Sequence, residues 1–242
     1  MTRVAWIVGG GSGIGRGAAV ALASPETLLV VSGRRADELA GTVDAVRAAG
    51  GVAHALPLDV SDPDAVRRAE ERICAEHGPV RLLVYSAGTN VPNRFWEDTT
   101  PEDFARVVDV NLTGAMRTVH AVLPGMREAG DGLVVLVSSW AGWRFAPGVG
   151  AGYSTSKSAL GALAETINAQ ERLNGVRATH FCPGEVATEI LDTRPQPPSP
   201  AERALMLTAD DIGTAIRWIA DLPARICMNE IVLTPTSNTS YA

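Results

Sequence analysis

Residues 3–15 read RVAWIVGGGSGIG, an apolar run that passes directly into a cluster of glycines, and the alanine-rich segment 18–23 follows. This order predicts a buried strand, a tight turn and a helix. Glycine permits the turn and lets the backbone approach phosphate groups, while the helix N-terminus offers them free N–H groups. The pattern predicts a dinucleotide site, although a glycine-rich turn can also be only a tight connection. The candidate binding residues are Gly9, Gly11, Ser12, Gly13, Ile14 and Gly15.

The end of the next apolar run indicates which dinucleotide binds. Sites for NAD usually carry an acidic residue about 20 residues after the glycines, which accepts hydrogen bonds from ribose hydroxyls. Here the run ends Ser32-Gly33-Arg34-Arg35, with no acid. Gly33 leaves room and Arg34 offers a planar fork that suits a 2′-phosphate, so NADP(H) is preferred, with NAD(H) as the alternative. Arg34 and Arg35 could instead be solvated residues at a helix start.

Short runs rich in Val, Leu and Ile alternate with stretches of helical period along the chain. This alternation is typical of a parallel sheet with helices on both faces. Seven strands are expected, at Arg3–Val8, Thr27–Ser32, Val52–Leu58, Arg81–Tyr85, Leu133–Ser138, Val176–Cys182 and Glu230–Leu233. The predicted fold class is α/β, a Rossmann-type doubly wound sheet of seven parallel strands in a single domain, residues 1–242.

Three helices have clear start or stop signals. Asp62-Pro63-Asp64 offers an N-cap and a first-turn proline for a helix that runs to about His77. Thr100-Pro101 repeats the signal for one long helix, whose expected apolar stripe is Phe104, Val107, Val108, Leu112, Ala115, Val119, Val122 and Leu123. A third helix is expected from near Gly152 to the C-cap pair Asn174-Gly175.

The segment from Leu191 to Pro200 is irregular, because four prolines in ten residues exclude a helix or a central strand. We interpret residues 189–208 as a mobile flap beside the substrate, with a short helical segment at Ala201–Leu207. A featureless surface loop is the alternative interpretation.

Composition restricts the partners. The net charge is −6 and the pI about 5.3, whereas nucleic acids and anionic membranes select basic surfaces, so neither is expected as a partner. The N-terminus lacks a signal-peptide pattern, and no segment has the roughly 18 apolar residues of a membrane span. The cysteines Cys74, Cys182 and Cys227 are widely spaced, which favours buried thiols over disulfides or a zinc site. We expect a cytoplasmic protein without a metal.

Tyr153 and Lys157 open the third helix, and a spacing of four places the phenol and the ammonium on one face. A free tyrosine has a pKa near 10 and is a poor proton donor at neutral pH, whereas a neighbouring cation favours the phenolate. This pair therefore predicts a general acid/base, with Lys157 also bonding the nicotinamide ribose. Such a pair also occurs by chance in many helices.

Two polar residues complete the candidate catalytic set. Ser139 follows the predicted fifth strand, at the sheet edge where open α/β sheets bind ligands, so it is expected to hold the substrate oxygen. Asn111 lies inside the predicted long helix, where an amide is a poor helix former. We expect it to hold a water that links Lys157 to solvent, or otherwise to make a local hydrogen bond.

These residues resemble the short-chain dehydrogenase/reductase family. The shared features, in the family's order, are GGGSGIG from Gly9, Leu58-Asp59-Val60, Ala87-Gly88, Asn111, Ser139, Tyr153-xxx-Lys157 and Pro183-Gly184. The resemblance implies that Tyr153 is the general acid/base, that Lys157 lowers its pKa and that Ser139 orients the carbonyl. It also implies that Asn111 completes a proton relay.

The resemblance further implies cofactor contacts from Asp59, Val60, Ala87, Gly88, Asn111, Tyr153, Lys157, Pro183, Gly184, Val186 and Thr188. From the residues alone, Asp59 could touch adenine or merely cap the next turn. A homotetramer is also implied, with a dimer as the alternative, and the long helix and the Tyr153 helix would form its interfaces.

Three departures from the family's pattern are visible, and none removes a catalytic group. Val8 replaces the usual threonine, and Tyr85-Ser86 replaces an asparagine pair, so some structural hydrogen bonds must be made differently. The interval from Ser139 to Tyr153 is one residue longer than usual, which indicates an expansion around Gly148–Gly152.

Aromatic residues flank the predicted catalytic strand ends. They are Trp140, Trp143 and Phe145 after Ser139, and Phe95 and Trp96 after the fourth strand, which indicates an apolar substrate pocket or packing in the core. The predicted activity is hydride transfer between NADP(H) and a carbonyl or secondary alcohol, on a small-molecule substrate that the residues do not name. An NAD-dependent alcohol dehydrogenase is the main alternative. A non-catalytic nucleotide-sensing protein would tolerate loss of the catalytic four, and a nucleotide-sugar epimerase would need a longer chain.

Overall fold

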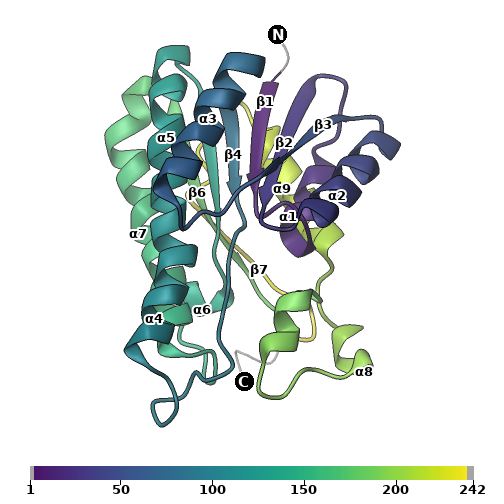
Figure 1. Cartoon of the computed structure of the whole chain (residues 1–242), viewed down its shortest axis with the longest axis vertical. Helices are drawn as coiled ribbons and strands as arrows, with labels where there is room; N and C mark the ends of the chain where they lie inside the picture. The colour runs from purple at the N-terminus through teal and green to yellow at the C-terminus, as the bar shows by residue number, and fades with distance from the viewer. Residues whose placement is uncertain (1–2, 239–242) are drawn as a thin grey trace.

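Seven strands form one sheet in the computed structural model, which describes residues 3–238 (Figure 1). The strands are β1 (Arg3–Val8), β2 (Thr27–Gly33), β3 (Val52–Pro57), β4 (Val80–Tyr85), β5 (Gly132–Val137), β6 (Val176–Pro183) and β7 (Glu230–Leu233). All neighbours are parallel, in the order β3-β2-β1-β4-β5-β6-β7. The order reverses between β1 and β4, and such a reversal opens a crevice at the carboxyl ends of the strands.

The predicted fold class, a single-domain doubly wound sheet of seven parallel strands, is confirmed. The ends of five strands differ from the predicted ones by one residue, at Gly33, Pro57, Val80, Gly132 with Val137, and Pro183. The predicted domain limits at residues 1 and 242 lie outside the described residues.

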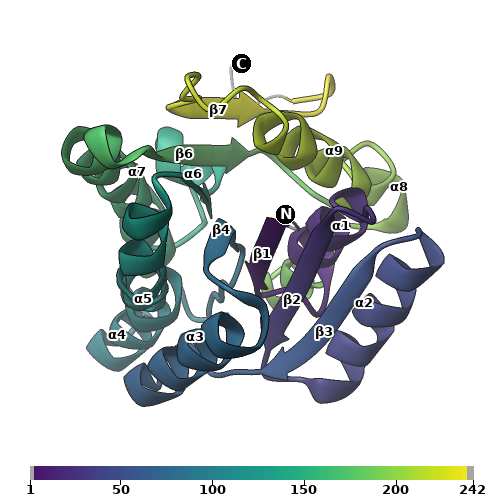
Figure 2. The same ribbon diagram turned by 90° about the horizontal axis from the view of Figure 1, so that it is seen from above.

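Helices cover both faces of the sheet, as the view from above shows (Figure 2). One face carries α1 (Gly13–Ala21), α2 (Ala36–Ala48) and α9 (Ala209–Ala220), and the other carries α3 (Pro63–His77), α5 (Gly114–Ala129) and α7 (Ala151–Glu171). The central strands are therefore buried on both sides, and all six residues of β5 are buried. This explains their continuous apolar sequences, since a strand with one wet face would alternate.

The polar atoms within this core are paired. Trp6 is fully buried in β1, and its indole N–H donates to the Ser32 hydroxyl at 2.9 Å on the neighbouring β2. A buried indole without a partner would cost about 1–3 kcal/mol. The hydrogen bond to Ser32 therefore allows the Trp6 indole to be buried within the sheet.

The prediction of one long helix from Thr100 is wrong in one respect, because the helix is interrupted. The helix α4 (Pro101–Val108) passes into a π-helical turn, η1 (Asp109–Thr113), before α5 begins. Such a turn disturbs the usual helical pairing, and here the Tyr85 hydroxyl donates to the Val110 carbonyl at 2.6 Å. A Cβ at Gly114 would lie 2.5 Å from the Tyr85 oxygen, so this contact also requires the glycine. Phe104, expected in the buried stripe, is 38% exposed.

The predicted capping signals are present. The Asp62 carboxylate accepts hydrogen bonds from the first turn of α3, and the Thr100 hydroxyl accepts one from the Asp103 N–H at the start of α4. The helix α7 begins one residue before the predicted Gly152, and a 3-10 turn, η2 (Arg172–Asn174), extends it to Gly175. A short helix, α6 (Trp140–Trp143), precedes the predicted expansion, which contains Gly148 and Gly150.

The segment predicted as a flap has partial secondary structure. A 3-10 turn, η3 (Glu189–Thr193), opens it, and the short helix α8 (Pro200–Arg203) follows the prolines. The helix predicted at Ala201–Leu207 is therefore shorter than expected and starts earlier. Ser199 decides this start, since its hydroxyl accepts from the Glu202 N–H at 3.3 Å and the Glu202 carboxylate accepts from the Ser199 N–H at 2.7 Å. The mobility of the flap stays a prediction.

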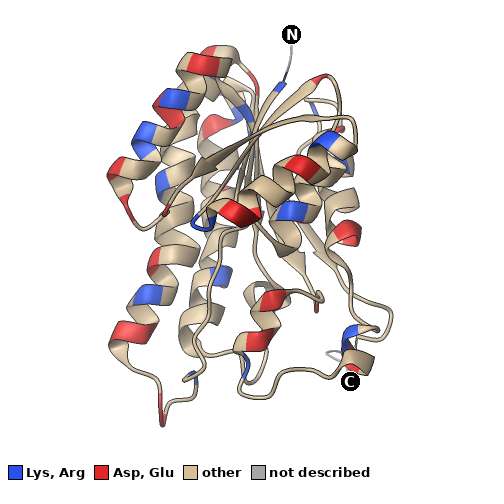
Figure 3. Ribbon diagram, turned by 45° about the vertical axis from the view of Figure 1, so that its right-hand side comes forward, with Lys and Arg blue, Asp and Glu red and all other residues tan. Residues whose placement is uncertain are grey.

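Acidic and basic residues are interleaved along the outer helices (Figure 3). In α3, Arg67 pairs with Glu71 and Arg72 with Glu76, each at 2.8 Å and one helical turn apart. This pattern is that of a solvated helix face. Among residues 3–238, no helix combines the length and the apolar character that crossing a bilayer requires.

The cysteines are free thiols, as expected, but the prediction that all are buried is wrong. Cys182 is buried in β6, whereas Cys74 and Cys227 are exposed. Cys74 follows Ile73, the residue of α3 that faces the core, so its side chain is on the outer side of the helix. Cys227 lies in the loop before β7.

Candidate active site

A cleft of about 310 Å³ lies where the strand order reverses, at the carboxyl ends of the central strands. The predicted cofactor residues that line it are Gly9, Gly11, Ser12, Gly13, Ile14, Arg34, Arg35, Asp59, Val60, Ala87, Gly88, Tyr153, Lys157 and Thr188. The fold thus brings segments from β1 to α7 and the start of the flap to one place. Gly15 and Asn111 lie outside this lining, and Pro183, Gly184 and Val186 line a neighbouring pocket, which Ser139 also lines.

The glycine turn is packed so tightly that larger side chains would collide. Gly9 has a φ of +84°, and a Cβ there would lie 2.4 Å from the Ala87 nitrogen. A Cβ at Gly15 would lie 2.1 Å from the Gly9 carbonyl oxygen. The Thr42 hydroxyl of α2 donates to the Gly10 carbonyl at 2.9 Å and holds the turn from behind. The turn is therefore shaped before any ligand binds, with the N-terminus of α1 facing the cleft.

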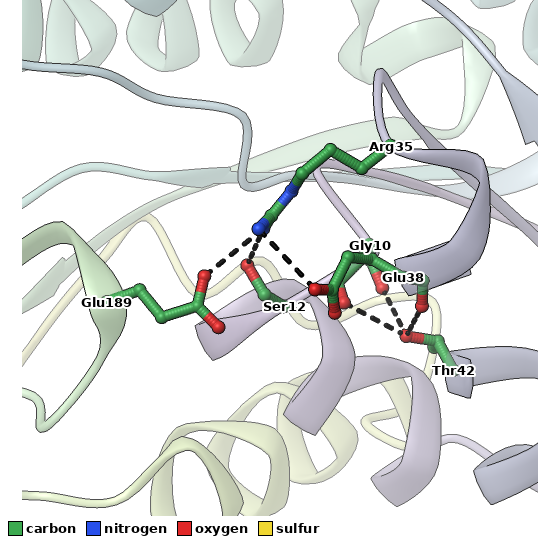
Figure 4. Close-up of polar contacts among 7 residues, drawn as sticks. Gly10, Ser12, Arg35, Glu38, Thr42 and Glu189 are labelled. Atoms are coloured by element: carbon green, nitrogen blue, oxygen red, sulfur yellow. Dashed lines mark hydrogen bonds and ion pairs between the residues drawn. The ribbon is translucent and has the colours of Figure 1, made fainter. Parts of the chain in front are cut away.

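Arg35 bridges the glycine turn and the flap (Figure 4). Its Nη2 donates to the Ser12 hydroxyl at 2.9 Å and to the Glu189 carboxylate at 3.2 Å, and Glu38 lies 3.5 Å from Nη1. Arg34 is exposed at the same edge of the cleft. Within residues 3–238, no carboxylate lies within 4.0 Å of the Arg34 guanidinium, so its charge faces the cleft without a direct ion pair.

Asp59 both caps a turn and faces the cleft. Its Oδ1 accepts hydrogen bonds from the Ser61 hydroxyl at 2.7 Å and from the Ser61 N–H at 2.9 Å. These bonds lower the pKa of the carboxyl, which therefore stays ionised at neutral pH. The capping role that the sequence left open is thus present, and Asp59 also lines the cleft beside Val60.

Asn111 is fully buried in the π-helical turn and clamps the segment after β4. Its Oδ1 accepts from the Thr89 N–H at 2.7 Å, and its Nδ2 donates to the Thr89 carbonyl and to the Ser156 hydroxyl, each at 3.1 Å. A Cβ at Gly88 would lie 3.4 Å from the Lys157 Nζ and 3.6 Å from the Asn111 Oδ1. Asn111 and Lys157 therefore face the same small space, while the predicted water relay stays a prediction.

The Ser139 hydroxyl lies close enough to the Tyr153 phenol to act on its pKa. Ser139 is the N-cap of α6, where its hydroxyl accepts from the Ala141 N–H at 3.2 Å, so its position is fixed. Burial raises the pKa of the Tyr153 phenol, while the Ser139 hydroxyl and the charges of Arg194 and Arg94 act against that rise. The predicted lowering of this pKa by Lys157 stays a prediction. Tyr153 lines both the cleft and the neighbouring pocket, and so stands at their junction.

Lys157 is buried below the cleft, with 4% of its surface exposed. Its Nζ donates to the Val137 carbonyl at 2.8 Å and lies 5.8 Å from the centre of the Tyr153 ring. Burial lowers the pKa of the Lys157 ammonium to about 8. The group is thus mostly charged at neutral pH but poised to lose its proton just above it.

Behind Lys157, β6 and β7 bring together His180, Cys182 and Glu230, whose ligand-type atoms lie within 4.8 Å of one another. Each of them already has a partner. His180 Nδ1 lies 2.9 Å from the Glu230 carboxylate, and the Cys182 sulfur lies 3.4 Å from Nε2. Burial raises the pKa of the Cys182 thiol to about 12, which disfavours the thiolate that a metal requires.

The neighbouring pocket, of about 610 Å³, lies on the other side of Tyr153. Of the five aromatic residues predicted there, Phe95 and Trp140 line it, and Trp143, Phe145 and Trp96 do not. Trp96 and Phe145 are 88% and 86% exposed, so neither the pocket prediction nor core packing holds for them. Trp143 instead packs edge-on against Trp140, with Arg144 over its ring. The pocket is consequently less aromatic than expected.

A match to a family model shows to which protein family the chain belongs. The model for short chain dehydrogenases matches residues 3–198, most of the chain. The chain belongs to the short-chain dehydrogenase/reductase family. This short-chain dehydrogenase/reductase is 32% identical over 98% of its length to the sulfoacetaldehyde reductase of Chromohalobacter salexigens and covers 95% of that protein.

Other relatives agree with this assignment. A glycine betaine reductase of Emericella nidulans is 31% identical over 96% of the chain, which spans 19% of that much longer protein. An alcohol dehydrogenase structure from the archaeon Thermococcus sibiricus, complexed with 5-hydroxy-NADP, is 29% identical with a TM-score of 0.86 and 98% coverage of both chains. This short-chain dehydrogenase/reductase is accordingly an NAD(P)-dependent oxidoreductase, and its preformed glycine turn and cleft fit a nicotinamide dinucleotide.

Several site residues of this short-chain dehydrogenase/reductase were not predicted. Some are chain neighbours of predicted ones, namely Leu58, Ser86, Thr89, Val137, Ser138, Glu189 and Ile190. Most of them lie at or just after the ends of predicted strands, which was a usable signal, whereas Glu189 and Ile190 open the predicted flap. Arg94, Glu185 and Arg194 line the other pocket. Glu185 follows the Pro183-Gly184 motif and Arg194 lies in the predicted flap, whereas no pattern in the sequence marks Arg94.

Proposed function

We propose that this chain interconverts a small carbonyl compound and its alcohol with NADP(H), and that Tyr153 acts as the general acid/base. The observation that carries the proposal is the position of the Tyr153 hydroxyl. Tyr153 lies beside Ser139 and lines both the cofactor cleft and the neighbouring pocket. A proton donor at that junction serves a reaction between two bound molecules.

In this mechanism Ser139 holds the carbonyl oxygen and Tyr153 gives it a proton. NADP(H), when bound, supplies or accepts the hydride. The Lys157 ammonium stabilises the phenolate that Tyr153 leaves behind, which offsets the effect of burial on the phenol. Asn111 holds a water that returns a proton toward Lys157. In alcohol oxidation the same residues act in reverse.

The preference for NADP(H) rests on Arg34. Its guanidinium faces the cleft without a direct carboxylate partner among residues 3–238, and the end of β2 offers no acid for ribose hydroxyls. A planar cation at this place favours a 2′-phosphate. NAD(H) is the alternative, and titration of the protein with NADPH and NADH by fluorescence distinguishes them. Tighter binding of NADH would reject the preference.

We also propose a homotetramer in the cytoplasm, with a dimer as the alternative assembly. Phe104 on α4 and Met116 on α5 are 38% and 49% exposed, on the helices that would form the interfaces. Exposed apolar side chains on adjacent elements favour association between copies. Light scattering on the purified protein measures the number of chains, and a monomer would contradict this part of the proposal.

Replacement of Tyr153 with Phe tests the assignment of the acid/base. The variant should lose about 10²- to 10⁴-fold in kcat, because it lacks the proton donor, while NADPH still binds within about twofold of the wild-type Kd. The relevant assay uses a panel of aldehydes, ketones and secondary alcohols. Retained turnover in Tyr153→Phe would reject the role of the phenol.

A further inference from the structure

Arg94 is a buried cation in the wall of the substrate pocket, with 6% of its surface exposed. It lies in the segment between β4 and α4, and its backbone is packed against the loop that leads to Tyr153. A Cβ at Gly150 would lie 2.8 Å from the Arg94 Cβ. Close packing against Gly150, which lies three residues before Tyr153, thus fixes the base of the Arg94 side chain.

The partners of Arg94 are neutral. Its Nε donates to the Val91 carbonyl at 2.8 Å, and its Nη2 donates to the Thr193 carbonyl at 2.7 Å and lies 3.5 Å from the Thr193 hydroxyl. In the part of the chain that the structure describes, no carboxylate lies within 4.0 Å of this guanidinium. A buried charge without a counter-charge is costly, so such groups are normally paired.

A second guanidinium is close by. Arg194 follows Thr193, to which Arg94 is bonded, and it lines the same pocket. Burial and the charge of Arg194 both lower the pKa of Arg94, and both cations act on the Tyr153 phenol. Arg194 pairs with Glu185 at 2.9 Å, and this carboxylate is half exposed. The pocket wall therefore keeps one uncompensated positive charge, that of Arg94.

We infer that Arg94, assisted by Arg194, is an anion subsite that receives a carboxylate, sulfonate or phosphate group of the substrate while Ser139 and Tyr153 hold its carbonyl. The inference rests on the proposed function and narrows its substrate class to oxo compounds that carry an oxyanion. A guanidinium recognises such groups through charge-assisted hydrogen bonds. The competing explanation is that Arg94 only ties Val91 to the flap through carbonyl contacts.

Matched substrates separate these explanations. The probes are 4-oxobutanoate and its neutral methyl ester, with sulfonate and phosphate analogues of similar length to identify the preferred oxyanion. The variants are Arg94→Gln and Arg194→Gln, and Arg47→Gln is the control. It removes an exposed positive charge whose carboxylate partner among residues 3–238 is Asp44, on the same helix α2. The measurement is kcat/KM for each probe with NADPH at saturation.

Wild type and Arg47→Gln should prefer the anionic probe over the ester by about 10- to 100-fold, a range expected for hydrogen bonds to charged groups. Arg94→Gln should reduce that ratio to about one while retaining activity on the ester. A smaller reduction is expected for Arg194→Gln, which also serves if Arg94→Gln fails to fold. An equal loss on both probes, or no preference in the wild type, overturns the inference but leaves the proposed function intact.

Absence of turnover on every probe would instead count against the proposed function. The inference is then decided by binding alone. Millimolar methanesulfonate should raise the melting temperature of the NADPH-loaded wild type but not that of Arg94→Gln. An equal rise in both proteins, or none in either, overturns the anion subsite.

Discussion

The two sides of Tyr153 are built in different ways. The cofactor side consists of short segments at the carboxyl ends of β1 to β5, and its shape is fixed by backbone packing, as between Gly9 and Ala87. The substrate side consists mostly of loops, together with the short elements α6 and η3, in the residues 90–95, 138–149 and 183–196. Its shape is fixed by side-chain contacts such as that between Arg94 and Thr193.

This difference determines what each side can tolerate. A site made of backbone requires particular glycines, and nearly any added atom disturbs it. Loops held by a few side chains accept substitution more easily, and they are where related enzymes on one fold differ in substrate. Substitutions on the cofactor side should therefore abolish binding, while those on the substrate side should change preference.

The largest effect is expected at Gly15. A Cβ in Gly15→Ala would lie 2.1 Å from the Gly9 carbonyl oxygen, so the turn must move. Overpacking of this kind costs about 1–3 kcal/mol or more, and the displaced turn should weaken NADPH binding by about 100-fold. Fluorescence titration measures the Kd, and urea unfolding measures the loss of stability.

Gly41→Ala is the matched control for that substitution. Gly41 lies inside α2, and the nearest atom to an added Cβ is the Arg16 Nη1, at 4.0 Å. Alanine should stabilise the helix by about 0.5–1 kcal/mol without changing the Kd. Equal effects of the two variants would show that the turn is not shaped by close packing.

The next effect concerns the cofactor's phosphate. In Arg34→Gln the Kd for NADPH should rise about 10- to 100-fold while the Kd for NADH stays within about twofold, because only a 2′-phosphate needs the guanidinium. Arg47→Gln again controls for the lost charge. Equal weakening of both cofactors would assign Arg34 a structural role instead.

The sequence predicted most of the residues that line the cleft, because their positions follow from local rules. The glycine turn, the strand ends at Asp59 and Ala87, and the Tyr153–Lys157 spacing are each visible within a few residues. Parallel strands then bring these segments to one sheet edge without further information. The π-helical turn at Asn111 was missed because it depends on Tyr85, a side chain distant in sequence that bonds a carbonyl inside the helix.

The substrate side was predicted less well because its contacts are long-range. Trp96 and Phe145 are aromatic residues of the kind that often line pockets, yet their side chains are exposed to solvent. Arg94 looks like any surface arginine in the sequence, and only its burial against Gly150 and Thr193 distinguishes it. Gly150 and Thr193 both lie more than 50 positions away from Arg94, and no periodicity connects them with it.

Each side of Tyr153 contains a buried cation, Lys157 on the cofactor side and Arg94 on the substrate side. Their contributions to stability should depend on pH in different ways. Burial lowers the pKa of Lys157 to about 8 from 10.5, so between these values the folded chain releases a proton that the unfolded chain keeps. The free energy of unfolding should therefore rise with pH over this window, by about 3 kcal/mol from Lys157. Below pH 8 both states are protonated, and this contribution is absent.

The measurement compares the cofactor-free wild type with Lys157→Met and Arg94→Gln from pH 7 to 10.5. The stability difference between wild type and Lys157→Met should change across the window, in favour of the wild type at high pH. The difference for Arg94→Gln should stay constant, because arginine remains protonated. A flat difference for Lys157→Met would mean that its ammonium is not destabilised by burial.

The smallest effect is expected at Arg203, which ties the two ends of the flap together. Its guanidinium bonds Asp192, the Thr188 carbonyl at 3.4 Å and the Pro198 carbonyl at 3.2 Å. These contacts are partly exposed, so Arg203→Gln should lower stability by less than about 1 kcal/mol. A looser flap should nevertheless raise the substrate KM about two- to fivefold with kcat unchanged.

Limited proteolysis in the flap should be faster in Arg203→Gln, since this variant loses the bonds to Asp192 and to the Thr188 and Pro198 carbonyls. Arg68→Gln is the control, because Arg68 is exposed and pairs only with Asp62, 3.7 Å away at the start of α3. If Arg203→Gln instead weakened NADPH binding as strongly as Gly15→Ala, the flap would belong to the cofactor side. The boundary between the side shaped by backbone packing and the side shaped by side-chain contacts would then have to be reconsidered at Thr188, which lines both the cleft and the neighbouring pocket.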